Sequence, residues 1–243
     1  MLTISSKKKK EKKLDNHSIK IEKTEIWITC ERALQLDDGR AIRGFFGNMY
    51  LNRPEFHGHN GNRLIYKHPL IQYKVFGGSA LVVGLKEGAY LLKAVPRLEY
   101  LEIHHQKYSI LKQNISVNTI PFGLTGNMIS YSFATPWIGL NEENYDRYLT
   151  LRKRCEDITP FIERILVGNI LSMSKSVGYE VKDRILIKAN IEGSGTVDVK
   201  DGIELMTFQG IFETNFLIPE LWGIGKFSSR GYGTIRCNGG GIN

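Results

Sequence analysis

Two short segments far apart in the chain carry the side chains best suited to chemistry. The first runs from Glu55 to His59 with the sequence EFHGH and is followed by Tyr66, and the second is a glycine-dense stretch from Gly223 to Gly233 that includes Lys226 and Arg230. Imidazoles can move protons at neutral pH because their unperturbed pKa is about 6.5. Cationic side chains on a glycine-rich loop can hold phosphates. Together these segments indicate acid–base chemistry on RNA.

The glycine-dense stretch differs from the better-known nucleotide loops. A dinucleotide or P-loop fingerprint needs a helix directly after the glycines. After Gly233 the chain offers a short strand from Thr234 to Cys237 and then the glycine-rich end from Asn238 to Gly241. No helix N-terminus is therefore available to hold a pyrophosphate, and we expect no nucleotide or other cofactor. The stretch is equally compatible with glycine turns that join the last strands.

The order of these features is similar to that of a known family. The Phe-His-x-His segment, the Tyr seven residues after its second His, and the terminal GIGKFSSRGYG resemble the CRISPR repeat-processing endoribonucleases of the repeat-associated mysterious protein (RAMP) superfamily. The resemblance is to the branch with two histidines and a tyrosine in the N-terminal half. It implies that His57, His59 and Tyr66 are catalytic. It also implies an RNA-binding loop whose residues are Lys226, Arg230, Gly223, Gly225, Gly231 and Gly233.

The resemblance implies an endoribonuclease that needs no metal ion. One histidine would remove the proton of the RNA 2′-hydroxyl and the other would protonate the departing 5′-oxygen, so that precursor RNA is cut within the repeat into guide RNAs with 5′-hydroxyl ends. Which histidine is the base stays open. The implied partner is the CRISPR repeat RNA. Hand-over of the product to a CRISPR effector complex and pairing into a homodimer stay open.

Two alternatives belong to other functional classes. His57, His59 and His68 could ligate a metal ion, although no cluster of Asp or Cys in the sequence completes such a site. The histidines could also be ordinary polar residues of a protein that binds RNA without cutting it, as a structural subunit of a larger RNA-guided complex would. Cleavage of repeat RNA by the purified protein separates these hypotheses.

Composition and charge agree with a protein that binds nucleic acid. The formal net charge is +8, of which the run from Lys7 to Lys13 supplies +5, with six lysines and one glutamate. Such a run is typical of a solvated tail that attracts phosphate without reading sequence. The longest apolar runs are too short to span a membrane, and we expect a cytoplasmic protein. Cys30, Cys155 and Cys237 match neither a disulfide framework nor a zinc site.

The periodicity predicts an α+β fold with two tandem ferredoxin-like (RRM-like) domains and a C-terminal glycine-rich loop. We expect a disordered lysine-rich tail over 1–18, an N-terminal domain over 19–122 and a C-terminal domain over 123–243. In the first domain the expected order is strand, helix, strand, strand, helix, strand. The expected elements are 19–29, 39–51, 70–76, 79–84, 87–94 and 98–104. Pro54 and two glycines end the first helix, which predicts that His57 and His59 lie on a loop.

Overall fold

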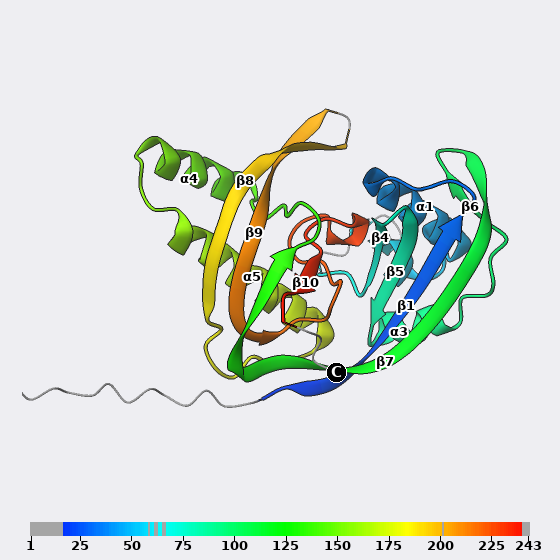
Figure 1. The fold of residues 1–243 in the computed structure, drawn as a ribbon, viewed down its shortest axis with the longest axis horizontal. Helices are drawn as coiled ribbons and strands as arrows, with labels where there is room; N and C mark the ends of the chain where they lie inside the picture. The colour runs from blue at the N-terminus through cyan, green and yellow to red at the C-terminus, as the bar shows by residue number, and fades with distance from the viewer. Residues whose placement is uncertain (1–16, 58, 61–62, 65–66, 201, 240–243) are drawn as a thin grey trace, which may run out of the picture.

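A computed structural model describes residues 17–57, 59–60, 63–64, 67–200 and 202–239, without the side chains of residues 59, 60, 63, 64 and 200. The chain forms two α+β halves joined by one long strand (Figure 1). The elements of the N-terminal half are β1 (Ile19–Cys30), η1 (Leu36–Asp38), α1 (Gly39–Met49), α2 (Pro54–His57), β2 (His59–Asn60), β3 (Arg63–Leu64), β4 (Ile71–Phe76), β5 (Ser79–Leu85), α3 (Glu87–Lys93) and β6 (Tyr100–Ile103).

The joining strand is β7 (Gln106–Phe133), which passes from one half into the other. The elements that follow it are α4 (Glu142–Lys153), α5 (Thr159–Val177), β8 (Ile187–Lys200), β9 (Ile203–Leu217), η2 (Ser228–Arg230) and β10 (Ile235–Cys237). In the N-terminal half the strand order is β4-β5-β1-β7, and in the C-terminal half it is β8-β9-β7-β10, with antiparallel pairing throughout. Each half therefore has the strand order of a ferredoxin-like unit, as predicted.

Two local predictions for the N-terminal half are wrong. The segment 98–104 does not supply the fourth strand of the sheet, because β6 pairs only with the start of β7 and it is β7 that lies beside β1. The His57 segment is not a plain loop, because 54–57 form the short helix α2 and the backbones of 59–60 and 63–64 form the two-stranded ribbon of β2 and β3. The first difference arises because β1 pairs with β7, which is remote from it in sequence. The second arises because α2, β2 and β3 are too short to show a hydrophobic period.

The N-terminal sheet is buried on both faces, which explains the apolar run in β5. Ala80 and Val82 pack with α1 in one hydrophobic cluster. Leu81, Val83 and Leu85 point to the other face and belong to the cluster formed mainly by the C-terminal half. Because side chains alternate along a strand, a strand between two cores reads as continuously hydrophobic. One face of β5 thus packs in the core of the N-terminal half, and the other face packs in the core of the C-terminal half.

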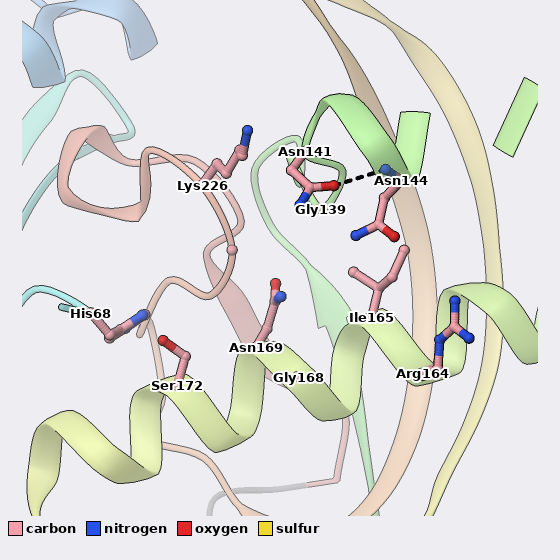
Figure 2. A pocket seen from close by; sticks show the side chains of 11 residues that line it. His68, Gly139, Asn141, Asn144, Arg164, Ile165, Gly168, Asn169, Ser172 and Lys226 are labelled. Atoms are coloured by element: carbon pink, nitrogen blue, oxygen red, sulfur yellow. Dashed lines mark hydrogen bonds between the residues drawn. The ribbon is translucent and has the colours of Figure 1, made fainter. Parts of the chain in front are cut away.

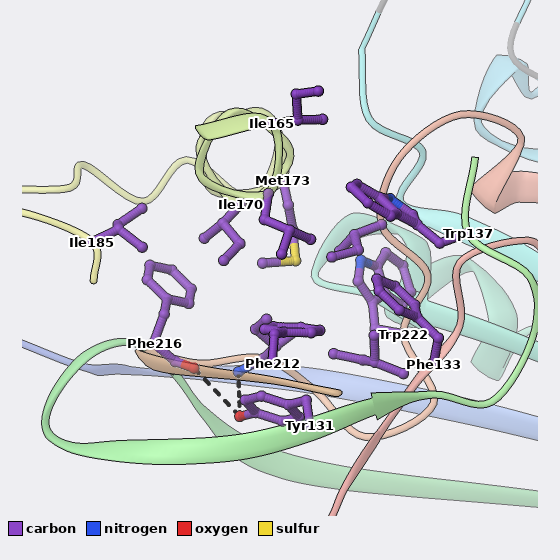
Figure 3. Packing of buried hydrophobic residues seen from close by; sticks show 14 of the residues in the cluster. Tyr131, Phe133, Trp137, Ile165, Ile170, Met173, Ile185, Phe212, Phe216 and Trp222 are labelled. Atoms are coloured by element: carbon purple, nitrogen blue, oxygen red, sulfur yellow. Dashed lines mark hydrogen bonds between the residues drawn. The ribbon is translucent and has the colours of Figure 1, made fainter. Parts of the chain in front are cut away.

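The C-terminal core is built around aromatic side chains from β7, β9 and the segment before β10 (Figure 3). Trp137 stacks on Phe133 at 5.2 Å, and Trp222 is fully buried in the same cluster. Tyr131 and Tyr148 are buried as well, whereas Tyr145 is 41% exposed on α4. Within the described residues no helix is long and apolar enough to cross a membrane.

The glycine-dense segment takes the place of a helix. In the N-terminal half, α1 and α3 each connect two strands of the sheet, whereas the C-terminal half has α4 and α5 in the first connection and the segment 218–234 in the second. That segment contains η2 and lies between the halves (Figure 1). An irregular, glycine-dense segment therefore lies where the repeated fold would put its last helix, and it contacts the N-terminal half through Gln72 and Lys74.

Candidate active site

Strand β4 positions both segments that the sequence singles out. On one face of the strand, the hydroxyl of Tyr73 donates a 2.9 Å hydrogen bond to the carbonyl of Phe56 in α2. On the other face, Gln72 and Lys74 are fully buried against the glycine-dense segment. Because neighbouring residues of a strand point to opposite faces, three consecutive residues of β4 connect the histidine segment and the glycine segment.

His57 ends α2 and packs against α1. Its Nε2 lies 3.1 Å from the carbonyl oxygen of Leu51, so the ring donates this hydrogen bond. In the neutral ring the lone pair is then on Nδ1. The guanidinium of Arg43 donates to the carbonyl of His57. A Cβ at Gly47 would come within 3.1 Å of His57 Cβ, so glycine at this position lets the helix and the imidazole approach closely.

For the other two predicted catalytic residues, His59 and Tyr66, side-chain positions are not part of the described structure. The backbone of His59 pairs with that of Leu64 in the ribbon of β2 and β3. The side chain of His59 and the whole of Tyr66 lie outside the described residues. His57 and the backbone of His59 therefore lie in the connection between α1 and β4. The assignment of His57, His59 and Tyr66 to catalysis stays a prediction.

A buried polar network holds both ends of the glycine-dense segment. Gln72 accepts a 2.7 Å hydrogen bond from the amide of Gly223 and donates a 3.0 Å bond to the carbonyl of the same residue. Lys74 donates to Gln72 Oε1 at 2.6 Å and to Thr234 Oγ1 at 3.2 Å. Burial and the nearby charge of Lys23 lower the pKa of Lys74. The network belongs to the N-terminal half, so it fixes the segment relative to α1 and α2.

The glycines within this segment have structural roles of their own. Gly225, Gly231 and Gly233 have positive φ angles of 86°, 99° and 62°. A Cβ at Gly233 would lie 2.1 Å from the carbonyl oxygen of Ile224, and one at Gly225 would lie 2.5 Å from Trp137 Nε1. Close packing inside the protein therefore requires glycine at these two positions. Contact of these glycines with RNA stays a prediction.

The two predicted phosphate ligands of the segment point into different hollows. Lys226 is exposed and lines a cavity beside α5. Arg230 is half-buried, lies 4.8 Å from the ring of Phe227 and donates to the carbonyl of Val199. It lines a second cavity, together with Arg40. The structure thus does not bring Lys226 and Arg230 together at one phosphate.

Arg230 instead joins two arginines of α1 that the sequence analysis missed. Burial lowers the pKa of Arg230 first, and the charges of Arg43 and Arg40 lower it further. Burial also lowers the pKa of Arg43. None of these three side chains forms an ion pair with a carboxylate within the described part of the chain. Asp37 and Asp198 line the same cavity as Arg40 and Arg230. The guanidinium groups still repel one another, which favours an anion between them, and Arg43 connects the cluster to His57.

A cavity of about 480 Å³ opens between the histidine segment, η2 and α5. Arg43, Phe56, Lys67 and Ser229 are among the residues that line it. Arg43 and Lys67 line this space, and so do the carboxylates of Glu55 and Glu87. The helical spacing of Arg43 and Gly47 was the signal available in the sequence, because residues four apart share a face of a helix. That face is the one that meets His57.

His68, a candidate metal ligand in the sequence, is part of the buried network. Its Nε2 accepts a 3.0 Å hydrogen bond from Trp222 Nε1 and lies 3.3 Å from Gln72 Nε2. Burial, with a smaller effect from Lys74, lowers the pKa of His68 to about 3. Over the described residues, no three His, Cys, Asp or Glu side chains come together as a metal site requires.

Comparison with known proteins identifies the family. A model of the Cas6b N-terminal domain matches residues 19–121, and a model of the Cas6b C-terminal domain matches residues 123–237. The chain belongs to the Cas6b family. The resemblance to CRISPR repeat-processing endoribonucleases is thereby confirmed, and with it the two ferredoxin-like halves of the fold.

Solved structures and a curated relative are also similar to this Cas6b chain. A crystal structure of Cas6b is 33% identical with a TM-score of 0.82, and the match covers 90% of this chain and 100% of the other. A structure described as the CRISPR RNA processing endoribonuclease Cas6b is 30% identical with a TM-score of 0.68 over the same shares. An uncharacterized protein of Methanocaldococcus jannaschii, MJ0978, is 38% identical over 136 residues, which are 56% of this chain and 90% of that protein.

Proposed function

We propose that this protein cleaves CRISPR precursor RNA within the repeat by attack of the RNA's own 2′-hydroxyl, without a metal ion, and leaves 5′-hydroxyl ends. Its membership of the Cas6b family and its likeness to a CRISPR RNA processing endoribonuclease support the activity and the RNA substrate. The protein is accordingly an endoribonuclease. The route of the reaction and the residues that perform it are the proposed part.

The observation that carries the mechanism is the common support of the two segments by β4. His57 and the glycine segment are held on opposite faces of one strand, with Arg43 bonded to the backbone of His57 and electrostatically coupled to Arg230. A phosphate held by this cluster would lie beside the imidazole of His57. Arginines placed there would stabilise the charge that develops on the phosphate as the 2′-oxygen attacks.

Proton transfer in this mechanism needs two groups with different protonation states. We assign His57 and His59 to the base and acid roles and the Tyr66 hydroxyl to orienting the 2′-oxygen or the phosphate. Two imidazoles suffice because one can be neutral while the other is protonated near pH 6.5. RNA supplies the nucleophile itself, so no step of this route calls on a metal ion.

The decisive experiment measures single-turnover cleavage of the repeat RNA in excess EDTA. We expect full activity, products with 5′-hydroxyl and cyclic or 3′-phosphate ends, and no cleavage of an RNA with a single 2′-deoxynucleotide just upstream of the cut. Activity that disappears in EDTA and returns with manganese or zinc would assign the protein to the metal-dependent nucleases.

Substitutions test the catalytic residues. His57→Ala and His59→Ala should each slow cleavage by at least about a hundredfold with RNA affinity retained, and Tyr66→Phe should slow it less. The matched control is His105→Ala, because this exposed histidine lies in the turn between β6 and β7, outside the proposed site. Parental rates in both His57→Ala and His59→Ala would place the active site elsewhere. A parent that binds the repeat tightly and never cuts it would support the RNA-binding subunit instead.

Two further partners are part of this proposal. A second copy of the chain is tested by light scattering of the protein with and without repeat RNA, where a doubled mass is the expected result. Transfer of the product to a CRISPR effector complex is tested by following labelled product RNA after the complex is added. Retention of all product on the endoribonuclease would contradict the transfer.

A further inference from the structure

A polar hollow beside α5 adjoins the cavity of the histidine segment, and His68 lines both. It has a volume of about 410 Å³ and lies between α5, the segment that leads into α4, and the start of the glycine-dense segment (Figure 2). Asn141, Asn144, Asn169 and Ser172 line it, and Lys226 lies across the hollow from the helix. The volume is in the range of small-molecule binding sites.

The protein orients two of the amides in this hollow. Asn169 accepts a 3.1 Å hydrogen bond from Trp137 Nε1, and Asn141 accepts a 2.8 Å bond from the backbone amide of Asn144. Each bond engages the side-chain oxygen. The NH₂ groups of Asn169 and Asn141 are therefore the ends that can donate to a ligand. Oriented amides of this kind are typical of sites that recognise the hydrogen-bonding edge of a base.

A glycine in the middle of α5 leaves the wall of the hollow open. Gly168 lines the hollow and is exposed, and a Cβ at this position would meet no protein atom within 4 Å. Glycine inside a helix is destabilising relative to alanine. Packing within the described structure does not explain the glycine at position 168, whereas close packing requires the glycines at positions 225 and 233. Absence of a side chain at this position keeps the hollow open.

The charges around the hollow favour an anionic ligand. Arg164 and Lys226 line it, and no Asp or Glu is among the described residues that do. Arg164, Gly168 and Ser172 are spaced four residues apart and so share one face of α5. Among the described residues that line the hollow, no Phe, Tyr or Trp is present, and the imidazole of His68 is the one aromatic ring. A base here would be recognised through hydrogen bonds at its edge, with cations placed for the phosphates on either side.

We propose that this hollow binds one unpaired nucleotide of the substrate RNA, away from the scissile phosphate, and that its amide donors prefer a base with carbonyl oxygens such as uracil. This inference rests on RNA being the substrate, as proposed above. It assigns Gly168, Asn169 and Arg164 to substrate selection, and not to the chemical step.

The test fills the hollow without disturbing its walls. Gly168→Leu should weaken binding of a non-cleavable repeat RNA, with a 2′-deoxynucleotide at the cut, by at least tenfold. The thermal midpoint should not fall, because leucine is a better helix former than glycine. The control is Gly44→Leu, since Gly44 is also an exposed glycine within a helix, with open space around its Cβ. Equal affinity of Gly168→Leu and wild type would overturn the proposal.

A second pair of variants separates charge from packing. Arg164 and Arg147 lie 5.3 Å and 5.6 Å from the ring of Phe161, but only Arg164 is among the residues of the hollow. Arg164→Gln should weaken RNA binding and reduce the slope of log affinity against log salt by about 0.7. Arg147→Gln should leave both unchanged. Equal effects of the two substitutions would contradict a site at the hollow.

The preference for a base is tested with homopolymers, apart from cleavage. Wild-type protein should bind oligouridylate more tightly than oligoadenylate, and Gly168→Leu should remove that difference. A difference that survives in Gly168→Leu would place base recognition elsewhere and overturn this inference. These binding measurements do not depend on turnover. A protein that fails to cleave repeat RNA would refute the proposed reaction but would leave the nucleotide site to be judged on binding alone.

Discussion

The side chain of Gln72 forms two hydrogen bonds with the backbone of Gly223, and we call this pair of bonds the Gln72 clamp. Its removal should greatly lower the free energy of unfolding. The side chain is 0% exposed and satisfies both backbone groups of Gly223, at 2.7 Å and 3.0 Å. In Gln72→Leu the new side chain has a similar size and no polar atoms. The buried N–H and C=O of Gly223 then lose their partner, and Lys74 loses its 2.6 Å acceptor.

The expected magnitude follows from the number of groups left without a partner. Each buried donor or acceptor that loses its hydrogen bond costs about 1–3 kcal/mol, so the two groups of Gly223 together predict a loss of about 2–6 kcal/mol. Gln113 provides a matched case in the same chain. It accepts from the amide of Leu98 at 2.8 Å and donates to the carbonyl of Pro96 at 3.0 Å, but at a more exposed place. Water can replace those bonds, and Gln113→Leu should cost less than about 1.5 kcal/mol.

The free energy of unfolding of both variants is measured by urea unfolding with tryptophan fluorescence as the signal. Trp222 is buried and directly precedes Gly223, so its emission should change when this region unfolds. The free energy of unfolding should fall for Gln72→Leu with little change in the m value. The reasoning is refuted if the two variants lose the same free energy, since burial is the main structural difference between the two clamps. It is also refuted if Gln72→Leu loses less than about 1 kcal/mol.

Other substitutions around the same network have expected outcomes. Lys74→Met should raise the free energy of unfolding at pH 7, measured in urea, because burial lowers the pKa of this lysine and its partners keep other hydrogen bonds. His68, with its pKa lowered to about 3, contributes stability that is present above about pH 6.5 and lost as the pH falls toward 3. The free energy of unfolding should therefore fall less steeply from pH 7 to pH 4 in His68→Gln than in wild type. Lys226→Ala and Arg230→Ala should each reduce the slope of log RNA affinity against log salt by about 0.7. Arg230→Ala should also lower the free energy of unfolding by about 1 kcal/mol, because it loses the contacts with Phe227 and Val199, whereas Lys226→Ala should not.

The sequence by itself determined the class of fold and the family. Apolar periodicity located β1, α1, the hairpin of β4 and β5, and α3 to within a few residues, because these elements bury a face that repeats at the period of a helix or strand. The spacing of the two histidines and the tyrosine, with the terminal glycine motif, was enough for the resemblance that the Cas6b models confirm. Both kinds of signal are local in sequence.

Only the tertiary structure decided what brings the segments together. Gln72 and Lys74 look like polar residues on an exposed face of a strand, and their burial depends on a glycine segment about 150 residues away. Arg43 carries no motif, and its place beside His57 depends on how α2 folds back on α1. The long strand β7 runs through Pro121, Gly123 and Gly126, across the predicted domain boundary, because it pairs with β1 before this point and with β9 after it. Long-range hydrogen bonds and burial set these positions, and neither has a period that a sequence can display.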